Sequence, residues 1–208
     1  MLELVNVSKH FGEKEVLDNI SLKFEDGNIY GLQGENGCGK TVILKLLAGY
    51  MPASEGKVYQ DGIEIRKNHN YIQNAGIVIE NVSFLPYLTL IDNLKMLKTM
   101  NKKITDEAIK FWIDYYHLNK HINTKYKNLS LGTKQKLALI QSFIHKPRIL
   151  LLDEPMNALD EDSVVLTKNV IKEYSGKGIV VMTSHISQDI SDLCNQRYLV
   201  QEGKASLK

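Results

Sequence analysis

Residues 34–41 read GENGCGKT and lie between an apolar run at 28–33 and a helix-like stretch at 42–48. A strand that leads through a glycine turn into a helix is the context in which a phosphate-binding loop (P-loop) works. The glycines leave backbone N–H groups uncovered, and the helix N-terminus behind them favours a negative charge. The segment therefore predicts a site for the phosphate chain of a nucleoside triphosphate.

Individual side chains of this loop are expected to contact the phosphates or a metal ion. Lys40 can reach the β- and γ-phosphates, and the Thr41 hydroxyl can hold Mg²⁺. Cys38 is expected to be a reactive thiol if it is exposed, or otherwise a small filler. The nucleotide-binding residues predicted here are Gly34, Glu35, Asn36, Gly37, Cys38, Gly39, Lys40, Thr41 and Val42.

Two carboxylates follow an apolar stretch later in the chain, where residues 149–155 read ILLLDEP. A carboxylate at the end of a strand can hold Mg²⁺, so Asp153 is a predicted metal ligand. Glu154 is expected to face the space beyond the γ-phosphate and to act as the general base toward the attacking water. Taken alone, the string also fits a polar strand end before a turn, but a P-loop in the same chain favours the catalytic interpretation.

A second anion site is indicated at residues 129–133, which read LSLGT directly before a predicted helix at 134–145. Ser130 is a good N-cap, and Gly132 leaves backbone N–H groups open at the helix N-terminus. On this segment alone, a simple helix cap is the better interpretation.

The composition limits the possible partners and compartments. The chain has 208 residues, of which 43% are hydrophobic and 24% charged, enough for one well-buried domain. Its 26 basic and 24 acidic side chains leave a net charge of +2, which gives no argument for a nucleic acid partner. The apolar runs are too short to cross a bilayer, no secretory signal is recognisable, and two cysteines fit a reducing compartment. We therefore expect a cytoplasmic protein, soluble or attached to a membrane through a partner.

Hydrophobic periodicity and turn residues predict the elements that must position these motifs. Strands are expected at 2–7, 15–24, 28–33, 56–65 (a hairpin closed at 61–62), 75–79, 148–153, 178–183 and 197–200. Helical patterns cover 42–48, 90–97, 106–118, 134–145, 162–174 and 187–194.

This order of elements predicts an α/β fold with a mainly parallel sheet core, a small antiparallel β subdomain and a helical subdomain inserted at about 81–146. The sequence contains no repeats, no low-complexity tracts and no linker between two domains. Residues 1–208 are therefore expected to form a single domain.

The set of motifs closely resembles the nucleotide-binding subunit of ATP-binding cassette (ABC) transporters, a P-loop NTPase, over essentially the whole chain. GENGCGKT resembles the Walker A loop of that family, ILLLDE its Walker B strand, and LSLGT its signature, normally written LSGGQ. NALD at 157–160 resembles the D-loop, which contains Asp160, and His185 resembles the switch histidine. Phe11 resembles the aromatic residue that stacks on adenine.

The resemblance implies an ATPase that uses ATP and Mg²⁺, with Glu154 and His185 as catalytic residues. In this resemblance, His185 would contact the γ-phosphate and relay its presence. Two chains, most simply a homodimer, would bind head to tail with two ATP molecules between them. The signature of one chain would face the γ-phosphate bound by Lys40 of the other, through Ser130, Leu131, Gly132 and Thr133. A separate integral membrane permease would convert this closure into transport and hold the chain at the inner face of the cell membrane.

One departure from the family pattern concerns the metal site. The glutamine that the family carries after the strand at 75–79 is Glu80 here. A carboxylate is also a hard oxygen ligand, so Glu80 joins Thr41 and Asp153 in the predicted metal set, with one more negative charge near the triphosphate. Glu80 and the following NVSFLPYLT are closest in pattern to the ATPases of bacitracin and lantibiotic exporters, which favours export of a peptide or antimicrobial compound.

Other departures lie in the signature and the P-loop. Leu131 and Thr133 stand where the family has a glycine and a glutamine, while Ser130 and Gly132 are retained. Val42 replaces a hydroxyl residue, which removes one side-chain hydrogen bond of about 1 kcal/mol but leaves a backbone N–H for the α-phosphate.

Two other functions remain open at this point. A soluble ABC ATPase acting on ribosomes, DNA or iron–sulfur clusters is disfavoured by the single cassette, the absence of a heptad array and the balanced charge. A regulatory module that binds nucleotide without turnover is disfavoured because Glu154 and His185 are both present. The permease contact is expected near residues 84–88 and the helical segment after them; the apolar run at 84–88 also fits ordinary core packing.

Overall fold

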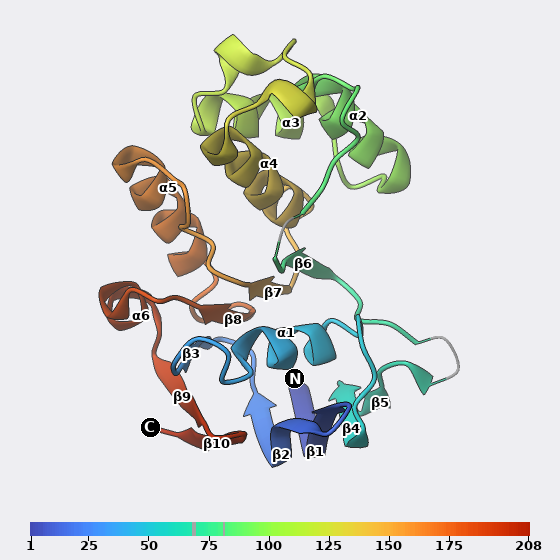
Figure 1. Cartoon of the computed structure of the whole chain (residues 1–208). Helices are drawn as coiled ribbons and strands as arrows, with labels where there is room; N and C mark the ends of the chain where they lie inside the picture. The colour runs from blue at the N-terminus through green and yellow to red at the C-terminus, as the bar shows by residue number, and fades with distance from the viewer. Residues whose placement is uncertain (68–69, 81) are drawn as a thin grey trace.

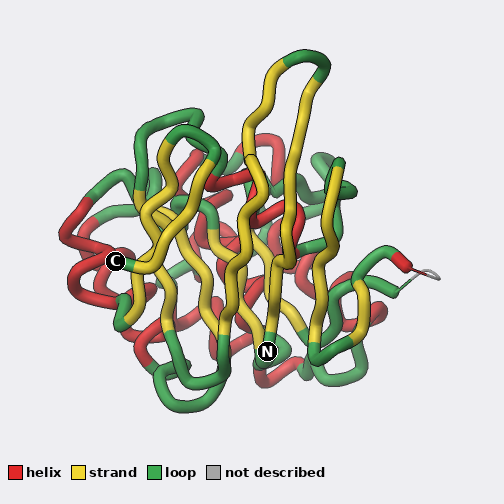
Figure 2. Tube along the Cα trace, turned by 90° about the horizontal axis from the view of Figure 1, so that it is seen from below, coloured by secondary structure: helices red, strands yellow, loops and turns green. Residues whose placement is uncertain are grey.

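The computed structural model of the chain describes residues 1–67, 70–80 and 82–208. Figure 1 shows two layers of strands with helix α1 (Lys40–Leu47) between them, and a group of helices that extends away from the larger sheet. In Figure 2, seen from below, the strands lie nearest the viewer and the helices lie mostly behind them.

The smaller sheet is antiparallel and has the strand order β2-β1-β4-β5. Its strands are β1 (Leu2–Phe11), β2 (Lys14–Phe24), β4 (Glu55–Gln60) and β5 (Ile63–Glu64). The hairpin predicted to close at residues 61–62 is confirmed, because Asp61 and Gly62 connect β4 to β5 with φ angles of 51° and 80°. Both angles are positive, as the favoured two-residue hairpin turns require.

The larger sheet has the order β10-β9-β3-β8-β7-β6 and is parallel from β9 to β6, which confirms the predicted parallel core. The edge strand β10 runs antiparallel to its neighbour, β9. Its strands are β3 (Ile29–Gln33), β6 (Ala75–Val78), β7 (Ile149–Leu152), β8 (Ile179–Thr183), β9 (Gln196–Gln201) and β10 (Lys204–Leu207).

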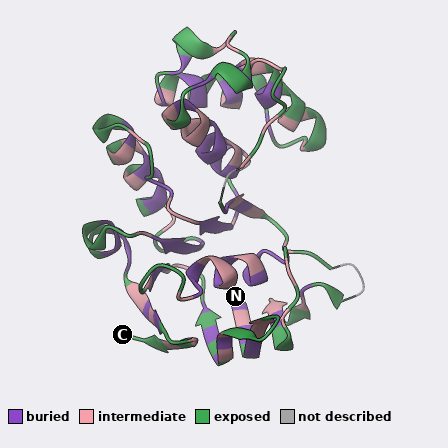
Figure 3. Ribbon diagram, in the orientation of Figure 1, coloured by how far each residue is buried: buried purple, intermediate pink, exposed green. Residues whose placement is uncertain are grey.

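The central strands of this sheet are buried on both faces, which explains their continuous apolar sequences. In β7, Ile149 and Leu151 belong to the apolar cluster formed with α1 and the smaller sheet. The alternate residues Leu150 and Leu152 belong to the cluster formed with the helices of the opposite face. Figure 3 shows β7 and β8 as buried, while the outward faces of the surrounding helices are exposed.

Helices from two parts of the chain cover the opposite face of the sheet (Figure 1). Between β6 and β7 lie α2 (Leu90–Met100), α3 (Asp106–Tyr115), two short 3₁₀ helices at Asn119–His121 and Tyr126–Asn128, and α4 (Leu131–Phe143). After β7 follow α5 (Glu161–Lys172) and α6 (Ser187–Leu193). Residue 81, at the expected start of the inserted helical segment, lies outside the described residues.

The expected boundaries differ from the observed ones at the helix that follows the signature. The prediction of 134–145 is wrong at its start, because α4 begins at Leu131. The Ser130 side chain accepts a hydrogen bond from the Thr133 backbone N–H at 3.2 Å and so caps the helix one turn earlier. The edge strand β10 was not predicted, since its KASL sequence is only four residues long and contains no β-branched residue. None of the helices in the described residues is long and apolar enough to span a bilayer.

Candidate functional site

The P-loop leaves β3 at the edge where the parallel strands end and turns sharply into α1. Gly34 begins this turn with a φ angle of 154°. A Cβ atom at Gly34 would lie 2.1 Å from the carbonyl oxygen of Val200 and 2.6 Å from Cys38 Sγ, so only glycine fits there. The close approach of the loop to β9 therefore fixes the start of the phosphate site.

Lys40 is the first residue of α1 and is buried. Its Nζ atom donates hydrogen bonds to the carbonyl oxygens of Gly34 and Glu35, each at 2.8 Å. The N-cap of α1 is Gly39, which offers no side chain as a cap, and the first turn contains no acidic residue. The ammonium group and the open N-terminus of α1 therefore face the same loop and together favour an anion.

A chain of hydrogen bonds links the P-loop to the ends of β7 and β8. Thr41 Oγ1 donates to Asp153 Oδ2 at 2.8 Å, and Thr183 Oγ1 donates to Asp153 Oδ1 at 2.7 Å. The same Thr183 oxygen accepts a hydrogen bond from the backbone N–H of Glu154 at 2.9 Å. The structure thus brings two of the three predicted metal ligands together.

Thr183 is a positioning residue that the sequence analysis did not assign. It is buried at the end of β8 and holds both carboxylate-bearing residues of the Walker B segment, Asp153 and Glu154. The sequence did offer a signal for this role. Thr183 ends the strand that was predicted next along the chain after the carboxylate-bearing strand, and parallel strands end at one edge of a sheet.

The two residues predicted to be catalytic contact each other directly. His185 Nδ1 lies 2.8 Å from Glu154 Oε2, and the His185 backbone N–H donates to the same oxygen at 3.1 Å. A carboxylate can only accept, so in this contact the proton is on Nδ1. Glu154 has a φ angle of 49°, a left-handed conformation that is costly for a residue with a side chain. The histidine therefore fixes the orientation of the predicted general base.

The oxygen ligands at this edge fit a magnesium ion that is bound together with phosphate. Thr41 and Asp153 offer a hydroxyl and a carboxylate 2.8 Å apart at the N-terminus of α1. In the part of the chain that the structure describes, no group of three His, Cys, Asp or Glu side chains could hold a metal by itself. Mg²⁺ commonly takes one or two protein oxygens and completes its shell with water and substrate phosphates, so the donor set suits it.

Glu80, the third predicted metal ligand, is placed differently. Its carboxylate forms an ion pair with Lys45 of α1 instead of contacting Thr41 or Asp153. The backbones of Asp153 and the Glu80 segment are nevertheless close in space. The Asp153 N–H donates at 2.6 Å to the carbonyl oxygen of Val78, two residues before Glu80.

The signature residues lie at the N-terminus of α4 and differ in exposure. Ser130 and Leu131 are exposed, Leu131 to 68%, whereas Thr133 is buried. The Thr133 hydroxyl lies 2.9 Å from the Ser130 hydroxyl and so supports it from inside. Thr133 therefore holds the cap in place, while Ser130 and Leu131 are the side chains open to a partner.

Within one chain, α4 is tied to the segment that follows Glu154. Gln135 Nε2 donates to the carbonyl oxygen of Pro155 at 3.0 Å, and Lys136 pairs with Asp160 at 2.7 Å. This lysine, together with the hydrogen bonds from Ser163, holds the pKa of the Asp160 carboxyl far below its usual value. The signature and the D-loop are thus one connected unit.

Gly132 shows how closely these two segments approach. A Cβ atom there would lie 2.6 Å from the carbonyl oxygen of Ala158, which is in the D-loop. The glycine at position 132, between the altered positions 131 and 133, is therefore explained by its D-loop neighbour. A side chain at this position would force the two segments apart.

Phe11 lies at the end of β1 and is 49% exposed. The Nζ atom of Lys9 sits 5.0 Å from the centre of its ring. The exposed ring is available for stacking.

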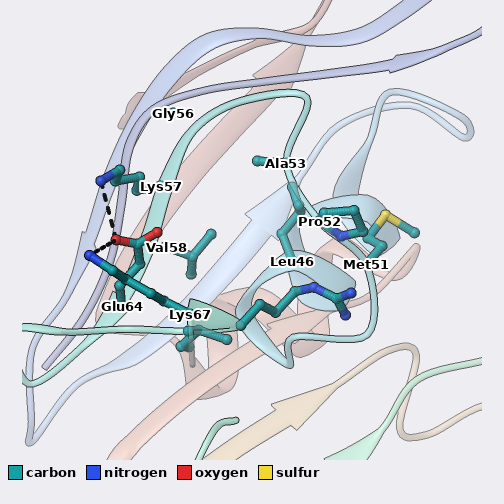
Figure 4. A pocket seen from close by; sticks show the side chains of 11 residues that line it. Leu46, Met51, Pro52, Ala53, Gly56, Lys57, Val58, Glu64 and Lys67 are labelled. Atoms are coloured by element: carbon teal, nitrogen blue, oxygen red, sulfur yellow. Dashed lines mark ion pairs between the residues drawn. The ribbon is translucent and has the colours of Figure 1, made fainter. Parts of the chain in front are cut away.

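The pocket in Figure 4 is separate from the phosphate loop. It has a volume of about 310 Å³ and lies near Leu46 and Pro52, at the C-terminal end of α1, with Glu64 paired to Lys57 and Lys67 at its rim. Leu46 is six residues from Lys40, which is about 9 Å along a helix. This pocket therefore does not belong to the site formed by Lys40, Thr41 and Asp153.

Comparison with known proteins assigns the chain to a family. Residues 17–157 match the ABC transporter family. The ABC transporter ATP-binding protein YybJ of Bacillus subtilis is 37% identical over 205 residues, which cover 98% of this chain and 94% of that protein. The lantibiotic transport ATP-binding protein SrtF of Streptococcus pyogenes is 30% identical over 209 residues, covering 100% of this chain and 90% of that protein. The chain therefore belongs to the ABC transporter family of ATP-binding proteins.

Solved structures confirm the fold. The dimeric structure of the ATP-binding cassette MJ0796, in a post-hydrolysis state bound to ADP and Pi, superimposes with a TM-score of 0.86 at 23% sequence identity. That match covers 100% of this chain and 98% of the other. The ATP-binding subunit of another ABC transporter gives a TM-score of 0.88 at 19% identity, covering 100% and 90% of the two chains. The predicted P-loop NTPase fold is thus confirmed.

Labelling of Cys38 by a maleimide is expected to block ATP binding, and ATP is expected to protect this thiol. Cys38 is half-buried inside the P-loop, whereas Cys194 is buried, which raises the pKa of its thiol to about 12 and leaves it unreactive. Mass spectrometry after N-ethylmaleimide treatment, followed by a nucleotide-binding titration, measures both effects. Cys38→Ala is the control that should bind ATP before and after treatment. Full ATP binding by completely labelled wild-type protein would contradict this prediction.

Proposed function

We propose that this chain is the ATP-hydrolysing subunit of an ABC exporter. It binds Mg²⁺ and ATP, closes with a second ATPase chain around two ATP molecules, and drives transport through a separate membrane permease. One relative, SrtF, is named for lantibiotic transport, and the Glu80 segment also favours export of a peptide or antimicrobial compound. The chain would lie at the inner face of the membrane, held there by the permease.

The observation that carries this proposal is the hydrogen-bonded chain from the P-loop to His185. It runs from Thr41 through Asp153 and Thr183 to Glu154, and from the Glu154 carboxylate to His185. A nucleotide held at Lys40 would thus lie next to oxygen ligands for a metal and next to a carboxylate oriented by a histidine. Positioning of this kind is most of what phosphoryl transfer requires from a protein.

The residues of this chain divide the reaction between them. Lys40 leaves the loop carbonyls and contacts the β- and γ-phosphates, and the first turn of α1 donates its N–H groups to them. Glu154 accepts a proton from the water that attacks the γ-phosphorus. The bond between that phosphorus and the oxygen bridging the β- and γ-phosphates breaks, and ADP and phosphate are the products. His185 keeps the Glu154 carboxylate directed at this water. Thr41 and Asp153 would hold Mg²⁺, which would offset part of the negative charge on the phosphate oxygens.

The second chain would complete the site from the opposite side. Ser130 and Leu131 present the N-terminus of α4 at the surface, which suits the γ-phosphate held by Lys40 of a partner. The ties from α4 to Pro155 and Asp160 support this role, because they would transmit closure at the signature to the Walker B segment of the same chain. We further propose that the helices between β6 and β7 act as one inserted subdomain, within a single domain of residues 1–208.

Mg²⁺-dependent ATP hydrolysis by the purified chain tests the proposed function. We expect phosphate release that requires Mg²⁺ and rises more than linearly with protein concentration, because two chains must meet. Tight ATP binding without turnover at any protein concentration would contradict the ATPase proposal and favour a regulatory module.

For the permease contact we favour a groove between α3 and the end of α5. It has a volume of about 770 Å³, contains the aromatic side chains Phe111, Trp112, Tyr115 and Tyr174, and has Lys146 and Lys177 among its charged residues. Phe111 is 56% exposed. The alternative contact at residues 84–88 is partly core, because the Phe84 ring packs 5.5 Å from that of Tyr126, although Tyr87 is 73% exposed.

Phe111→Asp is expected to reduce transport by the complete permease complex about 30-fold or more, as loss of a central aromatic anchor does at interfaces. Basal ATP hydrolysis of the isolated chain should stay within about twofold of the wild type. Tyr87→Asp is the matched variant for the other surface and should have the smaller effect. Unchanged transport with F111D and lost transport with Y87D would move the contact to residues 84–88.

A further inference from the structure

An ion pair on α1 lies beside the predicted metal site. Lys45 Nζ donates to Glu80 Oε1, with 23% of the Lys45 side chain and 58% of the Glu80 side chain exposed. Thr41 and Lys45 are four residues apart on α1, so their side chains share one face of the helix. This face therefore carries both the hydroxyl that binds Asp153 and the ammonium group that binds Glu80.

The carboxylates of Asp153 and Glu80 reach α1 from the ends of neighbouring strands. In the register of β6 and β7, Val78 lies opposite Leu152, and each carboxylate-bearing residue follows shortly after its strand. Glu80 has a φ angle of 54°, a left-handed conformation that is uncommon for a residue with a side chain. Asp153 is bound by Thr41 and Glu80 by Lys45, so each carboxylate has its own partner on the same helix face.

Glu80 brings a negative charge to a place where the family resemblance leads us to expect a neutral glutamine. A triphosphate at the N-terminus of α1 is strongly anionic, and Lys45 is only about 6 Å along the helix from Thr41. One uncompensated charge at about 10 Å from the phosphates changes the nucleotide affinity about threefold to tenfold. This range holds if the effective dielectric constant lies between that of a protein surface and that of water. Glu80 without a partner would therefore oppose nucleotide binding.

We propose that Lys45 is a positioning residue of the nucleotide site, which neutralises Glu80 and holds its carboxylate against α1. The inference rests on the proposed ATP-binding function and deepens it. Lys45 acts through Glu80 and contacts neither nucleotide nor metal. Because the pair is partly exposed, it contributes little to folding, so its removal changes binding and leaves the fold intact.

The test is a double-mutant cycle on nucleotide affinity, measured with a fluorescent ATP analogue both with Mg²⁺ and with a chelator. Lys45→Met is expected to weaken binding about threefold to tenfold in both conditions, because an uncompensated carboxylate is left near the phosphates. Lys45→Arg, which keeps the charge, should stay within about twofold of the wild type. The double variant K45M/E80Q should regain most of the loss, since no charge then remains to be neutralised.

Salt separates this charge effect from a packing effect. The loss in K45M should shrink when the ionic strength rises from about 0.05 M to about 0.5 M, because screening weakens the repulsion. Wild-type affinity in K45M, or a double variant as weak as K45M, would overturn the proposal. If a thermal melt shows that K45M is unfolded, the nucleotide affinity of Glu80→Gln alone tests the proposal. In that variant Lys45 has lost its carboxylate partner, so its positive charge should tighten nucleotide binding. Absence of nucleotide binding in the wild type would instead contradict the proposed function.

Discussion

Replacing Glu154 by glutamine (E154Q) is expected to lower the rate of ATP hydrolysis at least about 100-fold, since a positioned general base contributes about 100-fold to 10,000-fold. ATP binding should persist, because Lys40, Thr41 and Asp153 are unchanged. The amide can still accept the hydrogen bonds that the carboxylate receives from His185, so the local structure should remain. Phosphate release in single-turnover experiments, with a parallel binding titration, separates the two steps.

The matched control is Glu202→Gln, which removes an exposed carboxylate in the turn between β9 and β10. This variant should hydrolyse ATP at the wild-type rate. An E154Q protein with the wild-type rate would remove Glu154 from the role of general base, and the proton would then have to be accepted elsewhere.

Replacing Lys40 by methionine (K40M) is expected to weaken ATP binding about 10-fold to 100-fold, because hydrogen bonds to charged groups contribute about 1.5–3 kcal/mol. The fold should survive the change. The two carbonyl oxygens that Lys40 binds belong to the exposed residues Gly34 and Glu35, where water can replace the ammonium group. Isothermal titration with ATP and a thermal melt of the same sample measure both effects.

Lys172→Met is the control for K40M, since Lys172 is an exposed lysine in the last turn of α5. It removes the same charge and should bind ATP like the wild type. Equal affinities of K40M and wild type would show that the phosphates are held elsewhere.

Much of the fold could be predicted from the sequence because local signals and tertiary packing agree. The ILLLDE string is apolar throughout, and β7 is buried on both faces, as parallel strands are. The Asp61-Gly62 pair has the chemistry of the hairpin turn that it forms. The start of α4 was missed although Ser130 was recognised as a helix cap. A cap fixes the start of its helix only when the backbone N–H that it binds, here that of Thr133, is known.

The candidate site was predictable in its parts and less so in its connections. The P-loop and the Walker B carboxylates follow from residue types and spacing, because their chemistry depends on local backbone geometry. The contact from His185 to Glu154 and the hydrogen bonds from Thr183 to Asp153 and Glu154 depend on which strands are neighbours. The partner of Glu80 could not be predicted, because Lys45 lies 35 residues away and only the approach of α1 to the end of β6 brings them together.

The mass of the E154Q protein in solution, measured by light scattering with and without Mg²⁺ and ATP, tests most directly whether two chains close around the nucleotide. We expect a single-chain mass without nucleotide and twice that mass with Mg²⁺ and ATP, because blocked hydrolysis keeps the closed pair from reopening. Adding Leu131→Asp, which places a negative charge at the exposed signature, should abolish the change while leaving ATP binding at Lys40. A single-chain mass for E154Q saturated with ATP would contradict the head-to-tail pair and with it the role proposed for Ser130.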